Sequence, residues 1–365
     1  MSVDASPQPC APTPARRDEI VDLEVGPSHN CVLLGSSEIA CWGANGTAQL
    51  GRTGDVPNGT PALVVGDSVL GTLGCATGLA AGTSHTCAAT ANVDCWGAHL
   101  GGFGYSSAAD SFAIDDVQAI TSGARFACAL LRDSRVLCWG AAYRGQLGST
   151  TSDETREPRF VSGLEGADQL DGATSIAAGA DFACAVLRDG GVVCWGDNAW
   201  GQLGSGAPAS SAQPLRVPGV TSVVDVSAGG GHACARHEDG TVTCWGRSTF
   251  GQAGVVADIT PPTAAPRSMG AKVEAGGSHT CALTTTGAVL CWGYNRRGQL
   301  GDGTLIDRAE PVEVRDLGVV RELGAGTLHT CALSEDGVRC WGANNAGQVG
   351  GTGDSQIPRE VAFRF

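Results

Sequence analysis

The stretch HTCALTTTGAVLCWGYNRRGQLG, residues 279–301, contains two cysteines on either side of a polar turn, followed by Trp-Gly and then Gly-Gln-Leu-Gly. Cys281 and Cys291 are equidistant from Thr286, which lies in the turn. Two short apolar segments around a polar turn predict a β-hairpin. Cys281 and Cys291 then stand opposite each other on the two strands, close enough for a disulfide.

Almost the same phrase occurs seven times in the chain. Successive Cys-Trp-Gly triplets are 43 to 56 residues apart and begin at Cys41, Cys95, Cys138, Cys194, Cys244, Cys291 and Cys340. A second cysteine precedes each triplet, at Cys31, Cys87, Cys128, Cys184, Cys234, Cys281 and Cys331. Gly-Gln-Leu-Gly follows in full at 145–148, 201–204 and 298–301, and in altered form at 48–51, 251–254 and 347–350. The second copy, at 95–104, is one residue short and the most altered.

Seven repeats of about 50 residues, each composed of short strands, predict a β-propeller. We expect an all-β, seven-bladed propeller over residues 18–365, after a flexible Pro-rich extension at 1–17. The chain starts with an inner-strand segment at 20–25 and ends with an outer-strand segment at 358–365. We therefore expect these terminal segments to complete one blade together and close the ring, because closure removes exposed sheet edges.

The repeat resembles the regulator-of-chromosome-condensation repeat family, in a bacterial-type form with paired cysteines. The matching residues are Ala-Gly-x-x-His at 275–279, Trp-Gly-x-Asn at 292–295 and Gly-Gln-Leu-Gly at 298–301. The resemblance covers residues from about 20 to 365. It implies a seven-bladed propeller that works as a binding scaffold.

The hairpin symmetry predicts seven disulfides, each between the two cysteines of one repeat, and Cys10 and Cys75 remain as a candidate eighth pair. Reduced cysteines packed as small apolar groups are the alternative. Disulfides persist in oxidising compartments, so we expect a secreted, periplasmic or surface-exposed protein. The first 18 residues carry no recognisable signal peptide.

An aromatic ring precedes the first cysteine of each hairpin by two residues: His29, His85, Phe126, Phe182, His232, His279 and His329. Because phenylalanine replaces histidine in two copies, we expect packing with a backbone hydrogen bond rather than metal ligation. Gly-Asp-Gly-Thr at 301–304, with Asp307, offers oxygen ligands for calcium. A solvated turn is the favoured interpretation there, and whether calcium binds near Asp302 stays open.

Composition narrows the function. The net charge of −14 argues against binding to nucleic acid or an anionic membrane, since both need clustered positive charge. No apolar run approaches the roughly 18 residues of a membrane helix, and no catalytic, cofactor or phosphate-binding motif occurs. We expect a monomer without a cofactor or a metal and without enzymatic activity.

The variable residues of the loops after Cys-Trp-Gly predict a binding face, shared with the Ala-Gly-x-x-His turns. Aromatic and arginine side chains of this kind are enriched at interfaces. The candidates are Tyr143, Arg144, Trp200, Arg247, Phe250, Tyr294, Arg296 and Arg297. We expect a protein or peptide partner. A carbohydrate-binding propeller is the alternative, followed by an enzyme with residues gathered at the ring centre, and guanine-nucleotide exchange is disfavoured by charge and compartment.

Overall fold

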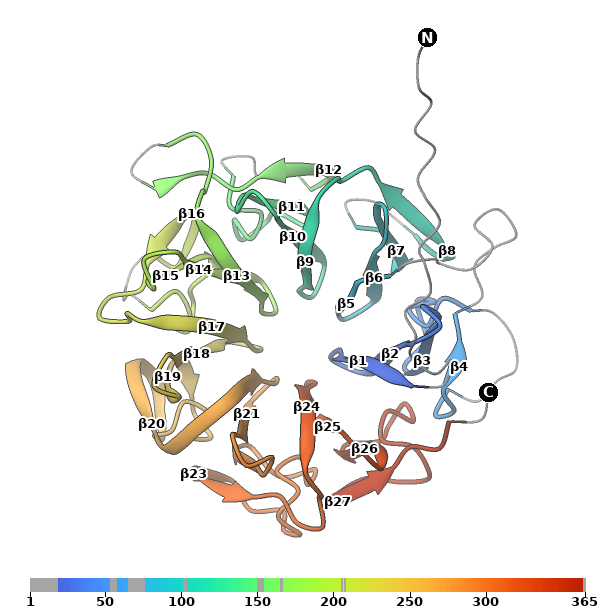
Figure 1. Ribbon diagram of the computed structural model, residues 1–365. Coiled ribbons are helices and arrows are strands. Elements are labelled where there is room, and N and C mark those ends of the chain that lie inside the picture. The colour runs from blue at the N-terminus through green and yellow to red at the C-terminus, as the bar shows by residue number, and fades with distance from the viewer. Residues whose placement is uncertain are drawn as a thin grey trace.

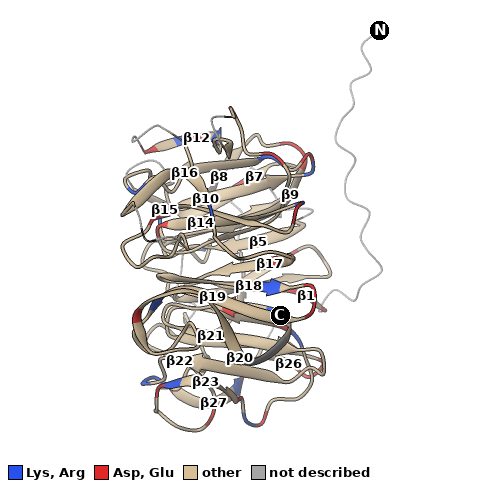
Figure 2. Cartoon of the chain, turned by 90° about the vertical axis from the view of Figure 1, so that its left-hand side faces the viewer, with Lys and Arg blue, Asp and Glu red and all other residues tan. Residues whose placement is uncertain are grey.

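The computed structural model describes residues 19–52, 58–64, 76–100, 104–149, 154–164, 167–204, 206 and 208–363. The described chain forms a ring of seven blades around a central axis (Figure 1), which confirms the predicted propeller. Seen from the side, the ring is a disc with loops on both faces (Figure 2). Over these residues, no helix is long and apolar enough to cross a membrane.

The first four blades each contain four antiparallel strands. Blade 1 consists of β1 (Ile20–Val25), β2 (His29–Leu34), β3 (Ile39–Gly43) and β4 (Ala62–Leu63). Blade 2 consists of β5 (Gly78–Ala81), β6 (His85–Ala89), β7 (Val93–Ala98) and β8 (Tyr105–Phe112). Blade 3 consists of β9 (Val117–Ser122), β10 (Phe126–Leu131), β11 (Val136–Gly140) and β12 (Thr155–Phe160). Blade 4 consists of β13 (Ala173–Ala178), β14 (Phe182–Leu187), β15 (Val192–Asp197) and β16 (Ser210–Arg216).

Blades 5 and 6 share one long strand. Blade 5 consists of β17 (Val223–Ala228), β18 (His232–His237), β19 (Thr241–Ser248) and the first part of β20 (Ala257–Ala275). The second part of β20 continues into blade 6 as its inner strand, followed by β21 (His279–Thr284), β22 (Val289–Gly293) and β23 (Arg308–Glu313). Blade 7 consists of β24 (Val320–Ala325), β25 (His329–Ser334), β26 (Gly337–Gly342) and β27 (Ser355–Glu360).

The two middle strands of each blade form the predicted hairpin. In blade 6, Cys281 stands directly opposite Cys291, and the other six hairpins pair their cysteines in the same way. All seven pairs are disulfide-bonded, with Cα–Cα distances of 4.0–4.1 Å. The predicted pairing within each repeat is therefore confirmed. Cys10 and Cys75 lie outside the described residues.

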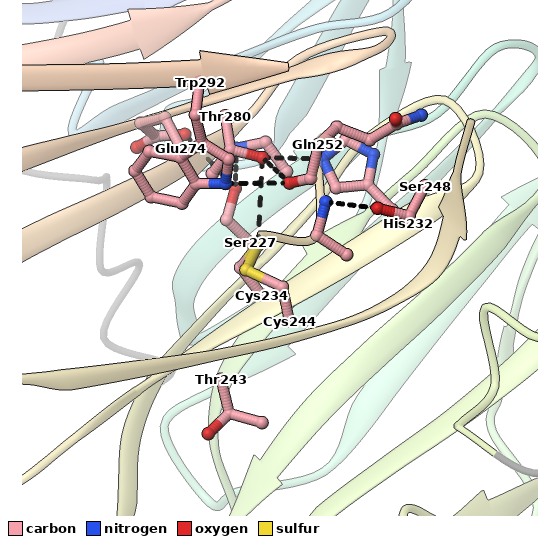
Figure 3. The surroundings of a disulfide bond; sticks show 12 residues. Ser227, His232, Cys234, Thr243, Cys244, Ser248, Gln252, Glu274, Thr280 and Trp292 are labelled. Carbon is pink, nitrogen blue, oxygen red and sulfur yellow. Dashed lines mark hydrogen bonds between the residues drawn. A yellow bond between two sulfur atoms is a disulfide. The ribbon is translucent and has the colours of Figure 1, made fainter. Parts of the chain in front are cut away.

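Neighbouring blades are joined at the glutamine of the Gly-Gln-Leu-Gly loop. The main-chain oxygen of Gln252, in blade 5, accepts hydrogen bonds from Thr280 Oγ1 (2.8 Å) and Trp292 Nε1 (3.0 Å) of blade 6 (Figure 3). The same indole bond recurs for Trp42, Trp96, Trp195, Trp245 and Trp341. All these indoles are almost fully buried, so each donor would be costly to leave unpaired.

The histidines that stand two residues before the first cysteine of a hairpin make a second contact between blades. His232 Nε2 lies 2.9 Å from Thr280 Oγ1 of the next blade. Because the threonine proton is already donated to Gln252, the histidine must donate from Nε2. Burial lowers the pKa of His232 to about 4, so the ring is neutral at pH 7. The expectation that these histidines hydrogen-bond the backbone is wrong. His29, His279 and His329, like His232, bond a side chain of the next blade.

Whether histidine or phenylalanine precedes the first cysteine of a hairpin correlates with the residue that it faces in the next blade. Histidine occurs where the next blade supplies threonine or asparagine, whereas Phe126 and Phe182 precede blades that carry Ala183 and Ala233 at that position. His85 is the exception, because blade 3 has Ala127 there. Both ring nitrogens of His85 are buried without a hydrogen-bond partner among the described residues.

The ring closes by contact between complete first and last blades. β27 pairs with β26 in blade 7, and β4 pairs with β3 in blade 1, so the expected blade shared by the two termini is wrong. His329 Nε2 instead lies 2.7 Å from Asn30 Oδ1 across the junction. Phe363 packs edge-on against Trp42, with ring centroids 5.5 Å apart. The backbone also takes part, because the Thr327 N–H donates to Pro27 O at 3.1 Å. The first and last blades thus close the ring through side-chain and backbone contacts.

We expect His85→Phe to stabilise the fold by about 1–3 kcal/mol, because it removes two buried unpaired nitrogens. Phe126 and Phe182 show that this ring fits against alanine. His232→Phe is the control and should destabilise, since it leaves Thr280 without its donor. Urea unfolding of both variants measures the difference, and equal signs for the two substitutions would contradict the pairing rule.

Removing one bridge, as in Cys331→Ala/Cys340→Ala, should lower the free energy of unfolding by about 2–3 kcal/mol on the chain-entropy estimate for a short loop. Peptide mapping of the unreduced protein should recover each hairpin as one linked species. Free thiols at these fourteen positions would show that the cysteines act only as apolar core residues.

Candidate functional site

The loops after Cys-Trp-Gly and the turns after the inner strands lie on the same face of the ring. Tyr143, in a loop of blade 3, bonds Asp181 in the turn of blade 4, with an oxygen–oxygen distance of 2.6 Å. Trp200 lies against Gly231 in the turn of blade 5, where an added Cβ would be 3.3 Å from Trp200 Cδ1. Each loop therefore covers the turn of the following blade, and we call this side the loop face.

Two side chains brace most of these loops. The asparagine of Trp-Gly-x-Asn accepts the backbone N–H five residues later, as Asn295 does from Leu300 (3.0 Å). Ser248 takes this role in blade 5, whereas blade 3 has Ala142 at this position. The glutamine side chain accepts the backbone N–H two residues before it. The residues held in this way are Thr47, Arg144, Trp200, Phe250, Arg297 and Ala346. The motif fixes the backbone of the variable residue whatever its side chain.

The variable side chains contact one another across blade boundaries. Arg144 Nε lies 3.8 Å from Asp197 Oδ1. The Arg247 guanidinium carbon lies 4.7 Å from the Trp200 ring centroid, and the Phe250 and Tyr294 centroids are 4.8 Å apart.

Seven of the eight predicted binding-face residues take part in these interblade contacts or adjoin a residue that does. The eighth, Arg296, lies in the same loop of blade 6 as Tyr294 and Arg297. We call the set from Tyr143 to Arg297 the aromatic arc. It comprises Tyr143, Arg144, Asp197, Trp200, Arg247, Phe250, Tyr294, Arg296 and Arg297.

Most arginines of the arc already have an acidic partner. Arg297 Nε lies 2.6 Å from Asp354 Oδ2, and Arg296 Nε lies 3.6 Å from Asp307 Oδ2. Burial and the hydrogen bond to Asp181 raise the pKa of Tyr143 to about 12, so it is a neutral hydroxyl. The arc is therefore close to neutral, although the whole protein is strongly acidic.

The arc is exposed and confined to one part of the ring. Tyr143 is 57% and Trp200 is 40% exposed. The equivalent positions of blades 7 and 1 carry Ala343, Ala346, Ala44 and Thr47. Sequence reasoning missed the exposed apolar residues Val256, Ile259, Leu305 and Ile306, of which Ile259 lies against Gly201 beside Trp200. The sequence feature that could have identified them is a group of apolar residues shortly after a Gly-Gln-Leu-Gly loop.

The turn considered for calcium uses its carboxylates within the loop. Asp302 Oδ1 accepts hydrogen bonds from Thr304 N (2.9 Å) and Asn295 Nδ2 (3.0 Å). Burial alone would raise the pKa of Asp302, but the bonds from Thr304 and Asn295 and the Arg308 charge lower it below its ordinary value. Asp307 Oδ1 accepts the Asn295 N–H at 2.8 Å. These carboxylates therefore stabilise the loop that carries Arg296 and Arg297.

A cavity of about 340 Å³ occupies the centre of the ring. Its rim at the loop face consists of small turn residues, among them Ala124, Ala180, Gly230 and Gly277. Deeper in, it is lined by Glu24, Asp225, Lys272 and Glu274. Lys272 is the only lysine of the chain, and its Nζ lies 2.9 Å from Glu274 Oε1.

Side chains of the inner strands also protect the backbone edges around this cavity. Glu24 Oε1 accepts the Ala81 N–H (3.1 Å), and Ser227 Oγ accepts the Ala275 N–H (3.0 Å) of the next blade. Inner strands are edge strands, whose free N–H groups need partners. Burial, with the neighbouring Asp22 and Glu274 charges, raises the pKa of Glu24 to about 8, although the Ala81 bond and Lys272 oppose this shift.

The histidines and acids of the ring do not converge. Over the described residues, no three His, Cys, Asp or Glu side chains are placed to hold one metal ion.

Comparison with known proteins agrees with this architecture. The RCC1-like domain profile matches residues 2–317, and the regulator of chromosome condensation (RCC1) repeat profile matches residues 320–348. The chain belongs to the RCC1-like domain family. RCC1-like propellers generally interact with proteins, and the matched residues include the loops that form the arc.

The relatives differ widely in size. E3 ubiquitin-protein ligase HERC2 of Mus musculus is 29% identical over 214 residues, which are 56% of this chain and 4% of HERC2. Ultraviolet-B receptor UVR8 of Arabidopsis thaliana is 29% identical over 213 residues, 54% of this chain and 46% of UVR8. This chain thus spans less than half the length of either RCC1-like relative.

The fold also matches a solved RCC1-like structure. Prp20p from Saccharomyces cerevisiae, described with its binding to Gsp1p and histones, has a TM-score of 0.76 at 22% identity, covering 87% of this chain and 83% of that chain. At this identity the likeness concerns the fold.

The raised pKa of Glu24 predicts a pH-dependent stability. A carboxyl whose pKa rises from 4.5 to about 8 on folding stabilises fully below the unfolded value, and the contribution is lost as pH rises towards 8. Burial also raises the pKa of Asp22, Glu274 and Glu322 despite the opposing Lys272 charge, which adds to the same trend.

Glu24→Gln should therefore weaken the fall in thermal midpoint between about pH 5 and about pH 9. Glu238→Gln, on an exposed turn of the opposite face, is the control and should follow the parent protein. If the thermal midpoint of Glu24→Gln fell with pH as steeply as that of the parent, the proton responsible for the pH dependence would not be bound at Glu24.

Proposed function

We propose that this chain is an exported binding module that holds a protein or peptide partner on the loop face of blades 3–6. The observation that carries this proposal is the aromatic arc, whose exposed and partly buried rings and arginines stand on loops braced by the glutamine and, in blades 4 and 6, also by the asparagine. Rigid presentation lowers the entropy cost of binding, and aromatic and arginine side chains dominate interface energetics.

Export is supported by the seven disulfides, because glutathione and thioredoxin keep cytosolic thiols reduced. Placement outside the cytosol separates this chain from the kind of partner named for Prp20p. We therefore propose an extracellular, periplasmic or surface partner.

The alternative of a carbohydrate-binding propeller is less well supported. Aromatic platforms for sugars would recur at equal positions in each blade, whereas only Trp200 and Phe250 are aromatic among the six braced residues. Their faces are also engaged by Arg247 and Tyr294. A protein or peptide, which mixes apolar and polar groups, suits this uneven surface better.

The proposal predicts that Trp200→Ala/Phe250→Ala abolishes partner capture from extracellular or periplasmic extract, with at least a tenfold loss in affinity for a protein identified by the parent chain. Val224→Ala/Val319→Ala is the matched control, because both valines are exposed near turns of the opposite face. Cross-linking with mass spectrometry should place the partner on blades 3–6. Capture that survives in the arc variant, or cross-links confined to the opposite face, would refute the loop face as the binding surface.

A further inference from the structure

The central cavity and the aromatic arc form one continuous surface. Trp200 lies against Gly231, and the preceding residue Gly230 lines the cavity. Tyr143 bonds Asp181, and the preceding residue Ala180 also lines the cavity. A partner seated on the arc therefore covers the cavity mouth.

Carboxyl groups outnumber cationic groups in the cavity. Three carboxyls, those of Glu24, Asp225 and Glu274, line it together with one ammonium group, that of Lys272. With its pKa raised to about 8, Glu24 is mostly protonated at pH 7 before a cation binds, and a cationic group beside it favours release of this proton. Lys272 is already engaged, because its Nζ pairs with Glu274 at 2.9 Å and donates to Leu323 O at 3.1 Å.

Among the described residues, no cationic side chain is in direct contact with the carboxyl of Glu24 or Asp225. Glu24 Oε1 accepts the Ala81 N–H, and Asp225 Oδ1 accepts Ser175 Oγ at 3.0 Å. The second oxygen of each accepts no hydrogen bond from the described residues. Both side chains are only partly buried, so an incoming cation can reach their second oxygens, and its charge would favour the ionised form of each carboxyl.

The shape of the cavity selects the kind of cation. Its carboxylates come from different blades, and no three acidic side chains converge on a metal position within the part of the chain described. The rim positions carry only small residues, namely Pro27, Thr83, Ala124, Ala180, Gly230, Gly277 and Thr327, so no long side chain from these positions covers the mouth. A long aliphatic stem with a terminal charge can pass such a rim and keep its head among carboxylates.

We propose that the partner held on the loop face inserts a lysine or arginine side chain into the central cavity, where its cationic head binds beside Glu24 and Asp225. This inference rests on the proposed function and specifies the partner chemistry: an apolar or aromatic residue for the arc, next to a basic residue for the cavity. Because most arc arginines are paired with Asp197, Asp307 and Asp354, the arc offers little repulsion to that basic residue.

A random peptide library displayed on phage and selected on the intact chain tests the partner chemistry. Peptides whose binding depends on Trp200 and Phe250 should carry Lys or Arg beside an aromatic or aliphatic residue. Their affinity should fall about tenfold for Glu24→Gln/Asp225→Asn, in which both amide oxygens can still accept the backbone or hydroxyl bonds. Glu238→Gln/Glu335→Gln, which replaces the same number of carboxyl groups on exposed turns of the opposite face, should bind as the parent does.

The outcomes separate the two proposals. Arc-dependent peptides without a basic residue, or with unchanged affinity for Glu24→Gln/Asp225→Asn, would overturn the cavity inference and leave the binding face standing. Peptides that bind independently of Trp200 and Phe250 would contradict the binding face itself.

A second measurement tests the cavity without any docked partner. Titration with Nα-acetyl-lysine methylamide should shift the backbone amide resonances of Gly230 and Gly277, and the uncharged norleucine analogue should not. Equal shifts with both compounds, or none with the lysine compound, would overturn the inference.

Discussion

The main-chain carbonyl of the Gly-Gln-Leu-Gly glutamine joins a blade to the next wherever the repeat carries this glutamine, and it positions the loop face. In six junctions it accepts an indole N–H that is buried. The same glutamine uses its side chain to hold the backbone of the variable loop residue, as Gln202 does for Trp200. Blade packing and surface presentation consequently depend on one residue, so the arc can vary in chemistry while its backbone stays fixed.

The sequence was sufficient for the elements whose partners lie nearby in the chain. Cysteines equidistant from a turn predict their own pairing, because the register of a hairpin follows from its turn. Contacts between blades were not predictable in this way. His232 and Thr280 are 48 positions apart, and the rule that histidine faces threonine while phenylalanine faces alanine is visible only when neighbouring blades are placed side by side.

The closure of the ring was misjudged because one outer strand is very short. β4 spans only Ala62–Leu63, yet Pro61 to Val64 repeats the Pro-x-x-Val pattern that marks the outer strand of blade 6 at 311–314. That signal gives blade 1 its own fourth strand and leaves β27 to blade 7. The cavity was missed for a different reason: its carboxylates are single residues on separate inner strands, and only the lone Lys272 distinguishes the region in the sequence.

The disulfides and the loop face belong to one arrangement. In each blade the second strand begins at the Ala-Gly-x-x-His turn, and the third strand ends in the loop that carries the arc, so both lead to the same face. A bridge between these strands fixes their register a short distance below that face without contacting it. Since a rigid surface loses less conformational entropy on association, the bridges would strengthen the proposed recognition as well as the fold. This gives a physical reason for the cysteines to recur in every repeat, including the second, where the loop motif itself has been lost.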